Sequence, residues 1–400
     1  MIRWSTVTYA TTRALQTGLG LLAGIGGAYF ALLTGATFLT RRRTSSRNSD
    51  GVRFAVVVPA HDEEQVISGT LKSLEHLDYP PDRYSVFVVA DNCSDATAEV
   101  AKRFRCNVWE RVDPDRSSKG HALNWAFERI PEKYDAIVVI DADTEVDPRL
   151  LTEFSRAYHP LEALQALDLQ VPGPGGAISA ASYVASALHN GLKPWGRESL
   201  GCSAGLLGTG MCLPTVILEE VPWQRFGLAE DSEYHMDLIL AGKRVRFVPK
   251  ARVEATAPNT FRSIQSQRLR WERGRTDALR RFARPLLERA IRKRDVRSLE
   301  ALASLVAPPF SLTISAAVGT MVLERMKHSR WSATVGALGL LAPVVATLRG
   351  LWLVRAPVSI YLNLFALPLF VAWRTYITFR SILQGVGEGW VRTERSKDRS

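Results

Sequence analysis

The sequence predicts an α/β protein in which a mainly parallel sheet is covered by helices, with transmembrane helices at both ends of the chain. Apolar strand-like runs alternate with helical patterns between about residues 50 and 260. Residues 14–40 contain no charged side chain, and neither do three later stretches, 301–323, 331–348 and 356–373. A membrane span needs about 20 mainly apolar residues, and short additions past Arg349 and Arg374 bring the last two stretches to that length.

Three strand-like runs in the central segment each end in acidic side chains. They cover residues 53–64, 84–95 and 134–145, and helical patterns follow the first two. Strands that are apolar along their whole length indicate a parallel sheet, and ligands of such sheets bind outside the carboxyl ends of the strands. The carboxylates expected there are those of Asp62, Glu63, Asp91, Asp95, Asp141 and Asp143.

Asp141 and Asp143 follow four apolar residues and are separated by a single alanine. Residues two apart on an extended chain face the same way, so the two carboxylates repel each other unless a positive group lies between them. A solvated turn and a divalent cation site both explain this pair.

Several enzyme classes are excluded by missing motifs. No GxGxxG follows the first strand, and the chain contains neither GxxxxGK[ST] nor GxSxG, so dinucleotide, P-loop and α/β-hydrolase chemistry are unsupported. The four cysteines form no CxxC pair, which argues against zinc and a disulfide framework and fits a reducing compartment.

The net charge of +11 is concentrated at 262–297. Interleaved Leu, Phe, Ile and Trp favour a helix on an anionic membrane surface over a nucleic-acid interface. The uncharged stretch at residues 14–40 is longer than the apolar core of a secretory signal peptide, so we expect it to be an uncleaved membrane anchor. Arg41, Arg42, Arg43 and Arg47 follow that anchor and predict that the next segment is cytoplasmic.

Seven motifs occur in an order that resembles one family. They are VVVPAHDEE, VVADNCSD, KGHALN, IDADT, GTGM, AEDSEYH and QRLRW. Their order is similar to that of family 2 inverting glycosyltransferases with a GT-A fold, and in particular to the membrane-embedded branch with the chitin, hyaluronan and cellulose synthases. The resemblance covers about residues 53–275.

The resemblance implies roles for the residues at the strand ends. Asp141 and Asp143 would form the DxD motif, with Asp143 the direct ligand of Mg²⁺ or Mn²⁺, an ion that stabilises the diphosphate leaving group. The other donor-binding residues would be Asp62, Glu63, Asp91, Lys119 and Arg270. His61 stands where many relatives have Asn, which leaves the contact at that position open.

The resemblance also implies the catalytic and acceptor residues. Asp231 would be the base, with Glu230 beside it to raise its pKa, although both carboxylates also suit the start of a helix. Gly208, Gly210, Gln267 and Trp271 would lie against the acceptor, while a buried anchoring role is the alternative for Trp271.

The sequence therefore predicts five segments. They are an anchor with its basic flank (1–45), a cytoplasmic GT-A domain (50–260), basic interfacial helices with QxxRW (261–298), C-terminal spans, by resemblance three (299–380), and a basic tail (381–400). A break is expected at Pro308-Pro309 in the first of these spans.

The expected enzyme is a multi-pass protein of the plasma or inner membrane. It would transfer a sugar from a UDP-linked donor to a growing polysaccharide or a lipid-linked glycan. Transfer of one sugar onto a lipid carrier and an inactive membrane scaffold are the alternatives. The expected partners are the donor, the glycan and the bilayer, and not nucleic acid. The sequence leaves the sugar, the linkage, the side of the C-terminus and the oligomeric state open.

Overall fold

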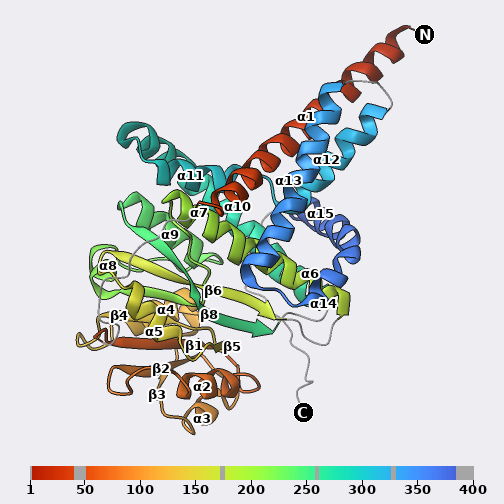
Figure 1. The fold of residues 1–400 in the computed structure, drawn as a ribbon. Coiled ribbons are helices and arrows are strands. Elements are labelled where there is room, and N and C mark those ends of the chain that lie inside the picture. Colours follow the sequence, from red (N-terminus) through yellow and green to blue (C-terminus); the bar gives the residue numbers. More distant parts are fainter. Residues whose placement is uncertain (1, 40–50, 172–175, 257–260, 326–329, 384–400) are drawn as a thin grey trace.

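A computed structural model of the chain describes residues 2–39, 51–171, 176–256, 261–325 and 330–383. Its central feature is an eight-stranded sheet with the strand order β3-β2-β1-β4-β7-β6-β8-β5 (Figure 1). The strands are β1 (Phe54–Ala60), β2 (Tyr84–Asp91), β3 (Asn107–Arg111), β4 (Ala136–Val139), β5 (Thr144–Val146), β6 (Glu162–Val171), β7 (Met211–Pro214) and β8 (Arg244–Thr256).

The first four strands form a parallel block, in which β1, β2 and β4 are the three predicted apolar runs and β3 was not predicted. β1 pairs with both β2 and β4 in parallel, and β2 pairs with β3. The short β7 then runs antiparallel between β4 and β6, while β6 and β8 are again parallel. The edge strand β5 is antiparallel to β8. This sheet confirms the mainly parallel α/β fold, with two antiparallel strands, β5 and β7, that the sequence did not predict.

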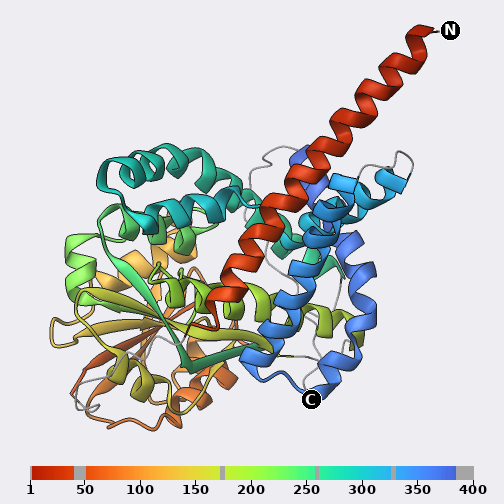
Figure 2. The ribbon, with the colours of Figure 1, turned by 45° about the horizontal axis from the view of Figure 1, so that its top comes forward.

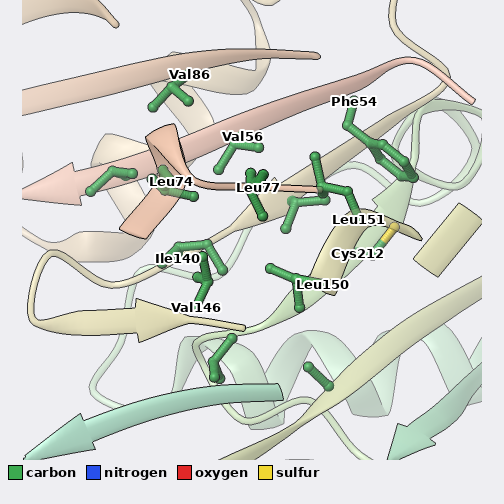
Figure 3. Packing of buried hydrophobic residues seen from close by; sticks show 14 of the residues in the cluster. Phe54, Val56, Leu74, Leu77, Val86, Ile140, Val146, Leu150, Leu151 and Cys212 are labelled. Carbon is green, nitrogen blue, oxygen red and sulfur yellow. The ribbon is translucent and has the colours of Figure 1, made fainter. Parts of the chain in front are cut away.

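Alternate residues of each parallel strand enter two different cores. Phe54 and Val56 pack with Leu74 of α2 and Leu150 of α5 on one face, as Figure 3 shows. Ala55 and Val57 of the same strand pack on the other face, against α4, α8 and α9. Both faces are therefore buried, which explains why β1 is apolar along its whole length.

The longest helices lie toward the two ends of the chain. The central segment contains α2 (Ile67–Glu75), α3 (Thr97–Ala101), a 3₁₀ turn (Pro114–Arg116), α4 (Lys119–Phe127), α5 (Leu150–Ala157), α6 (Gly176–Ser186), the π-helix η2 (Ala187–Leu192), α7 (Lys193–Leu200), α8 (Thr215–Glu220) and α9 (Glu230–Leu240). The other helices are α1 (Ile2–Ala36), α10 (Phe261–Lys293), α11 (Val296–Val306), α12 (Phe310–Arg325), α13 (Arg330–Val354), α14 (Val358–Leu362), a 3₁₀ turn (Leu364–Ala366) and α15 (Leu367–Leu383).

Three helical segments among the described residues are long and apolar enough to cross a membrane: Thr11–Ala36, Thr334–Val354 and Val358–Thr378. α1, α12 and α13 lie side by side and extend away from the sheet (Figures 1 and 2). Arg41, Arg42, Arg43 and Arg47, on which the predicted orientation depends, lie outside the described residues.

The stretch predicted as one span at 301–323 is two helices. α11 and α12 are bent by 63° at a short break that contains Pro308 and Pro309. Neither proline has a backbone N–H, and the first disfavours helical geometry at the residue before it, so the helix ends there. This pair counts as a fourth span only if the two bent helices are taken together.

Candidate active site

The carboxyl ends of β1, β2 and β4 meet at one edge of the sheet because the three strands are parallel neighbours. Asp62 follows β1 with a left-handed backbone (φ 55°), an uncommon geometry for a residue other than glycine. Its carboxylate accepts hydrogen bonds from Ser94 N (2.6 Å) and Ser94 Oγ. Burial raises the pKa of Asp62, but the bonds from Ser94 outweigh it and leave the pKa below its usual value.

Glu63 continues this turn, and its backbone N–H donates to Thr97 Oγ1 (2.8 Å). Asp62, Cys93 and Asp95 lie close enough together to suggest a metal cluster. The carboxylate of Asp95, however, accepts bonds from the Thr97 and Glu64 amides, and that of Asp62 accepts from Ser94. These carboxylates therefore hold the β1 and β2 loops together.

Asp91, the last residue of β2, is buried and forms an ion pair with Arg111 at the end of β3. Burial raises the pKa of Asp91, and the Arg111 guanidinium opposes that rise. Arg111 Nη1 and Asn92 Nδ2 both donate to Asp91 Oδ1. Arg111 also pairs with Asp113 (3.0 Å).

A cavity of about 220 Å³ lies beside this pair and is lined in part by Arg111, Arg116 and His121. The ring of His121 stacks on Phe226, with centroids 4.2 Å apart. The sequence did not predict Arg111, because only the strand order places the end of β3 beside Asp91.

Lys119, the first residue of α4, connects two groups of carboxylates. Its ammonium forms an ion pair with Asp141 and lies 3.9 Å from Glu230 Oε1. It also donates to the Gly208 carbonyl oxygen (2.8 Å). Burial lowers the pKa of Lys119, but the surrounding carboxylates outweigh it and raise the pKa above its usual value. The ammonium therefore stays charged between Asp141 and Glu230.

Asp141 and Asp143 lie directly beyond β4, and the Asp141 amide donates to Thr209 Oγ1 (3.1 Å). A third carboxylate, that of Asp168 on β6, interacts electrostatically with both. Burial, together with the charges of Asp141 and Asp143, raises the pKa of Asp168 to about 7. Asn190 donates to Asp168 Oδ2 (2.9 Å) from the π-helix η2, a helix type that occurs mainly at functional sites.

Asp168 was not predicted from the sequence. It ends no strand, and its approach to Asp141 and Asp143 depends on the pairing of β6 with β7. A β-bulge between Ala166 and Leu167 precedes it, and bulges next to active sites re-aim side chains.

Glu230 and Asp231 begin α9, as the sequence predicted. Burial, and then the neighbouring Asp231 charge, raises the pKa of Glu230 to about 7, and burial also raises the pKa of Asp231. Asp231 Oδ1 accepts a bond from Ser232 N (2.7 Å). The other oxygen, Oδ2, would lie 3.4 Å from a Cβ placed on Gly208. Asp231 therefore directs its Oδ2 toward the Gly208 turn.

The two glycines of GTGM have different surroundings. Gly208 has φ 85° and lies between Lys119 and Asp231, so a side chain there would enter the site. Gly210 has φ 63°, and a Cβ on it would lie 2.9 Å from the Cβ of Ala166. The packing around Gly210 lets β7 approach β6, which is a structural reason for this glycine.

The QxxRW motif lies on α10. Among its three marked residues the structure describes the side chain of Trp271, which is 39% exposed, whereas the side chains of Gln267 and Arg270 lie outside the description. A Cβ on Gly274 would lie 2.5 Å from the Cβ of Ala229. α10 therefore crosses the chain directly before Glu230, and positions 267, 270 and 274 share one face of the helix.

The donor set fits a divalent cation. Asp141 and Asp143 provide oxygen atoms, the ligands that Mg²⁺ and Mn²⁺ prefer, and the charges of both act on the nearby carboxylate of Asp168. Together with Glu230 and Asp231 they outnumber the ammonium of Lys119, so the site carries excess negative charge. A bound cation would relieve that excess.

A parallel sheet whose strand ends bring these carboxylates together beside one lysine defines the GT-A class of sugar-transferring enzymes. Residues 52–274 match the family described as Glycosyltransferase like family 2. The chain therefore belongs to this glycosyltransferase family.

Known relatives match part of this chain and not all of it. The chain is 30% identical over 248 residues to the probable glycosyltransferase YdaM of Bacillus subtilis (58% of this chain, 57% of YdaM). It is 22% identical over 265 residues to the poly-β-1,6-N-acetyl-D-glucosamine synthase of Staphylococcus epidermidis (64% of this chain, 63% of the synthase). It is 26% identical over 235 residues to the β-monoglucosyldiacylglycerol synthase of Synechocystis (55% of this chain, 47% of the synthase). The matches thus span about half to two thirds of these relatives.

One solved structure is similar over most of its length. The mannosyltransferase PcManGT from Pyrobaculum calidifontis, solved with GDP-Man and Mn²⁺, superposes with a TM-score of 0.53 at 16% identity. The superposition covers 85% of this chain and 99% of PcManGT. At this identity the likeness confirms the GT-A fold alone.

Proposed function

We propose that this glycosyltransferase is membrane-bound and inverting, and that it transfers a sugar from a nucleoside diphosphate donor, UDP-linked, to a growing polysaccharide or a lipid-linked glycan. The observation that carries the proposal is the position of Lys119. Its ammonium pairs with Asp141 on the expected donor side and faces Glu230 and Asp231 on the expected acceptor side. The expected donor side and the expected acceptor side therefore meet at the ammonium group of Lys119.

Asp231 is proposed as the base. The acceptor hydroxyl oxygen attacks the anomeric carbon, the bond from that carbon to the diphosphate oxygen breaks, and the hydroxyl proton passes to Asp231. A raised pKa makes Asp231 a stronger base near neutral pH. Its Oδ1 is held by the Ser232 amide, while Oδ2 faces the Gly208 turn.

The donor is proposed to bind along the strand ends. Asp62, Glu63, Asp91 and Arg270 would bind the nucleotide, and Lys119 would neutralise charge on the diphosphate. Asp141, Asp143 and Asp168 would hold Mg²⁺ or Mn²⁺, which supplies positive charge to the departing diphosphate when bound.

The acceptor class follows from the relatives and from the membrane helices. One relative is named for a polysaccharide and another for a glycolipid, and each matches more than half of this chain. We propose a cytoplasmic site whose acceptor lies at the membrane surface near Gly208, Gly210, Gln267 and Trp271. Transfer of a single sugar onto a lipid carrier is the second candidate, favoured by the glycolipid synthase.

The first experiment is a UDP-release assay on detergent-solubilised full-length protein with a panel of UDP-sugars, Mg²⁺ or Mn²⁺, and with or without membrane lipid extract. Release with one sugar and a high-mass product without lipid would support a polysaccharide synthase. Release only with lipid extract would support transfer onto a lipid. No release with any donor would contradict the proposal and favour an inactive scaffold, and a product that retains the anomeric configuration by NMR would contradict inversion.

A further inference from the structure

A hollow of about 520 Å³ lies at the corner between α10 and α11, outside the carboxylate site. The end of α7 forms one wall, with Leu200 and Gly201, and the α10–α11 corner forms the other. The charged residues that line it are Arg289, Lys293, Arg294, Asp295 and Arg297. No residue assigned above to the donor, base or acceptor lines this hollow.

The single carboxylate among these lining residues is already engaged. Asp295 Oδ2 accepts a bond from Arg289 Nε (2.9 Å), and Asp295 Oδ1 accepts one from Arg297 N (3.1 Å). Arg289 also donates to the Leu240 carbonyl oxygen at the end of α9 (3.0 Å). Arg289 and Asp295 therefore fix the corner and neutralise each other.

Three cations remain without a counter-charge. Within the part of the chain that the structure describes, the side chains of Lys293, Arg294 and Arg297 form no ion pair and no hydrogen bond. Earlier on the same helix, by contrast, Arg284 pairs with Glu288 (2.8 Å). The hollow thus collects unpaired positive charge, and Arg294 has a left-handed backbone (φ 51°), a strained conformation of the kind found at functional sites.

Three apolar side chains on α10 and α11 are exposed, and Val296 among them lines the hollow. Ile291, Val296 and Leu299 are 69%, 64% and 54% exposed. α11 continues through the 63° bend into α12, and both views show the α10–α11 hairpin extending to one side of α1 (Figures 1 and 2). Cations next to exposed apolar side chains, on a helix continuous with an apolar one, match the charge and polarity of a membrane interface.

We infer that this hollow binds the phosphate of an anionic bilayer lipid, with Lys293, Arg294 and Arg297 around the phosphate and Ile291, Val296 and Leu299 against the lipid chains. A phosphate supplies the missing negative charge and several acceptor oxygens for the two guanidinium groups. A free phosphate compound would satisfy the cations but would leave the three apolar side chains in water. The inference does not depend on which sugar the enzyme transfers.

The test is native mass spectrometry of the full-length protein in detergent, titrated with phosphatidylglycerol or with phosphatidylcholine of the same acyl chains. Each Lys or Arg near an anionic surface contributes roughly a factor of five in affinity, so three set a ceiling of roughly a hundredfold. We expect the triple variant K293Q/R294Q/R297Q to bind phosphatidylglycerol at least about tenfold more weakly than wild type, with phosphatidylcholine binding unchanged.

The matched control R280Q/R284Q/K133Q removes the same number of charges away from the hollow and should retain wild-type affinity. Equal phosphatidylglycerol affinity in wild type and the triple variant would overturn the inference, as would an equal loss in the control. Inorganic phosphate that displaces the lipid at a similar concentration would show a free-phosphate site instead. UDP release and the unfolding midpoint of the triple variant, measured in parallel, identify any loss that comes from misfolding.

Discussion

Lys119 lies where two sets of like charges would otherwise repel one another. Asp141 pairs with it directly, and Glu230 and Asp231 both act on its pKa. A single ammonium cannot neutralise all three carboxylates, so part of their charge is left for a cation and for protons. Burial, and then this surplus of negative charge, raises the pKa values of Glu230 and Asp231, while Lys119 remains protonated.

Asp231→Asn should abolish transfer and leave the donor site intact. The amide cannot accept the hydroxyl proton, and general-base catalysis contributes roughly 10²–10⁴ in rate. We expect kcat to fall by about that factor, while the Kd for UDP in Mn²⁺ stays within about twofold of wild type. A variant that loses UDP binding as well would contradict the role of Asp231 as base.

Asp143→Ala tests the other half of the site. Removal of a direct ligand should abolish the dependence of UDP binding on the metal, because the remaining oxygens hold a divalent ion poorly. The measurement is a Mn²⁺ titration of UDP binding by calorimetry. Asp147→Ala, which removes a carboxylate that pairs with Arg149 outside the site, is the control. An unchanged Mn²⁺ titration in Asp143→Ala would refute the ligand role.

Asp168 predicts a pH dependence of stability. Unfolded Asp168 loses its proton near 3.8, whereas the folded protein retains that proton up to about 7. The folded state thus binds more protons between these values and loses stability as the pH rises. In the presence of a chelator, Asp168→Asn should therefore unfold at a higher temperature than wild type at pH 8, with a smaller difference at pH 5.

Added Mn²⁺ should reverse that order at pH 8, because it binds the charged carboxylate and not the amide. If the difference in unfolding midpoint between wild type and Asp168→Asn were the same at every pH from 5 to 8, Asp168 would not be held neutral by its surroundings. The readout is the unfolding midpoint in detergent, which does not require turnover.

The residues that the sequence identified are those that end apolar strands or begin helices, such as Asp141 and Asp231. Such positions can be recognised along the chain, because strand ends of a parallel sheet meet at one edge. Arg111 and Asp168 were missed because their contacts join strands whose neighbours no local pattern reveals. Asp91 was found, but its ion pair with Arg111 was not.

At the scale of elements, the packing of α10 against α9 positions the proposed base. Gly274 of α10 packs on Ala229, the residue before Glu230. The other end of α9 is held by Arg289, which donates to the Leu240 carbonyl oxygen. α10 thus contacts α9 at both ends and fixes where Asp231 points.

Gly274→Ala should disturb the packing of α10 against the start of α9. The added methyl would lie 2.5 Å from the Cβ of Ala229, so one of the helices must shift. Overpacking of this kind costs about 1–3 kcal/mol, and we expect both a lower unfolding midpoint and a lower kcat. Gly18→Ala is the control, since nothing lies within 4 Å of its added Cβ. Wild-type kcat in Gly274→Ala would show that the contact does not position Asp231.

The parallel strands β1, β2 and β4 were predictable because each is a continuous apolar run that ends in acidic side chains. The antiparallel strand β7 could not be predicted, because a sequence of four buried residues does not indicate in which direction the strand runs. The residues of α6, the π-helix η2 and α7 follow one another directly, so the π-helix could not be predicted from a local helical pattern. The hydrogen bond from Asn190 to Asp168 is the contact that connects the π-helix to the site. The break at Pro308-Pro309 was predicted, whereas the 63° angle depends on packing.

At the scale of the whole molecule, the sheet and the membrane helices share one hydrophobic core. Leu167 and Leu169 of β6 pack with Phe30 of α1 and with Ala346 and Leu351 of α13. A polar network adds to this contact, because Arg197 of α7 bonds both Tyr29 of α1 (3.0 Å) and Glu300 of α11 (2.8 Å). The proposed boundary near residue 260 therefore does not separate two independent cores.

A fragment of residues 51–256 should consequently be poorly soluble. It would expose Leu188 and Leu192, which are buried in the full chain and lie against Gly350 of α13, as part of one apolar patch. We expect it to elute from a size-exclusion column as aggregate, while the full chain in detergent elutes as a defined species. A monodisperse fragment that binds UDP would show that the sheet folds without the membrane helices.

The shared core also sets an order of events during synthesis. β6 leaves the ribosome long before Ala346 and Leu351 have been made, yet these residues complete the packing around it. The growing chain must hold an unfinished core until its last helices have been made. In the proposed membrane-bound enzyme, insertion of the C-terminal helices would be the step that completes this core, so we expect a defect in insertion to be a defect in catalysis as well.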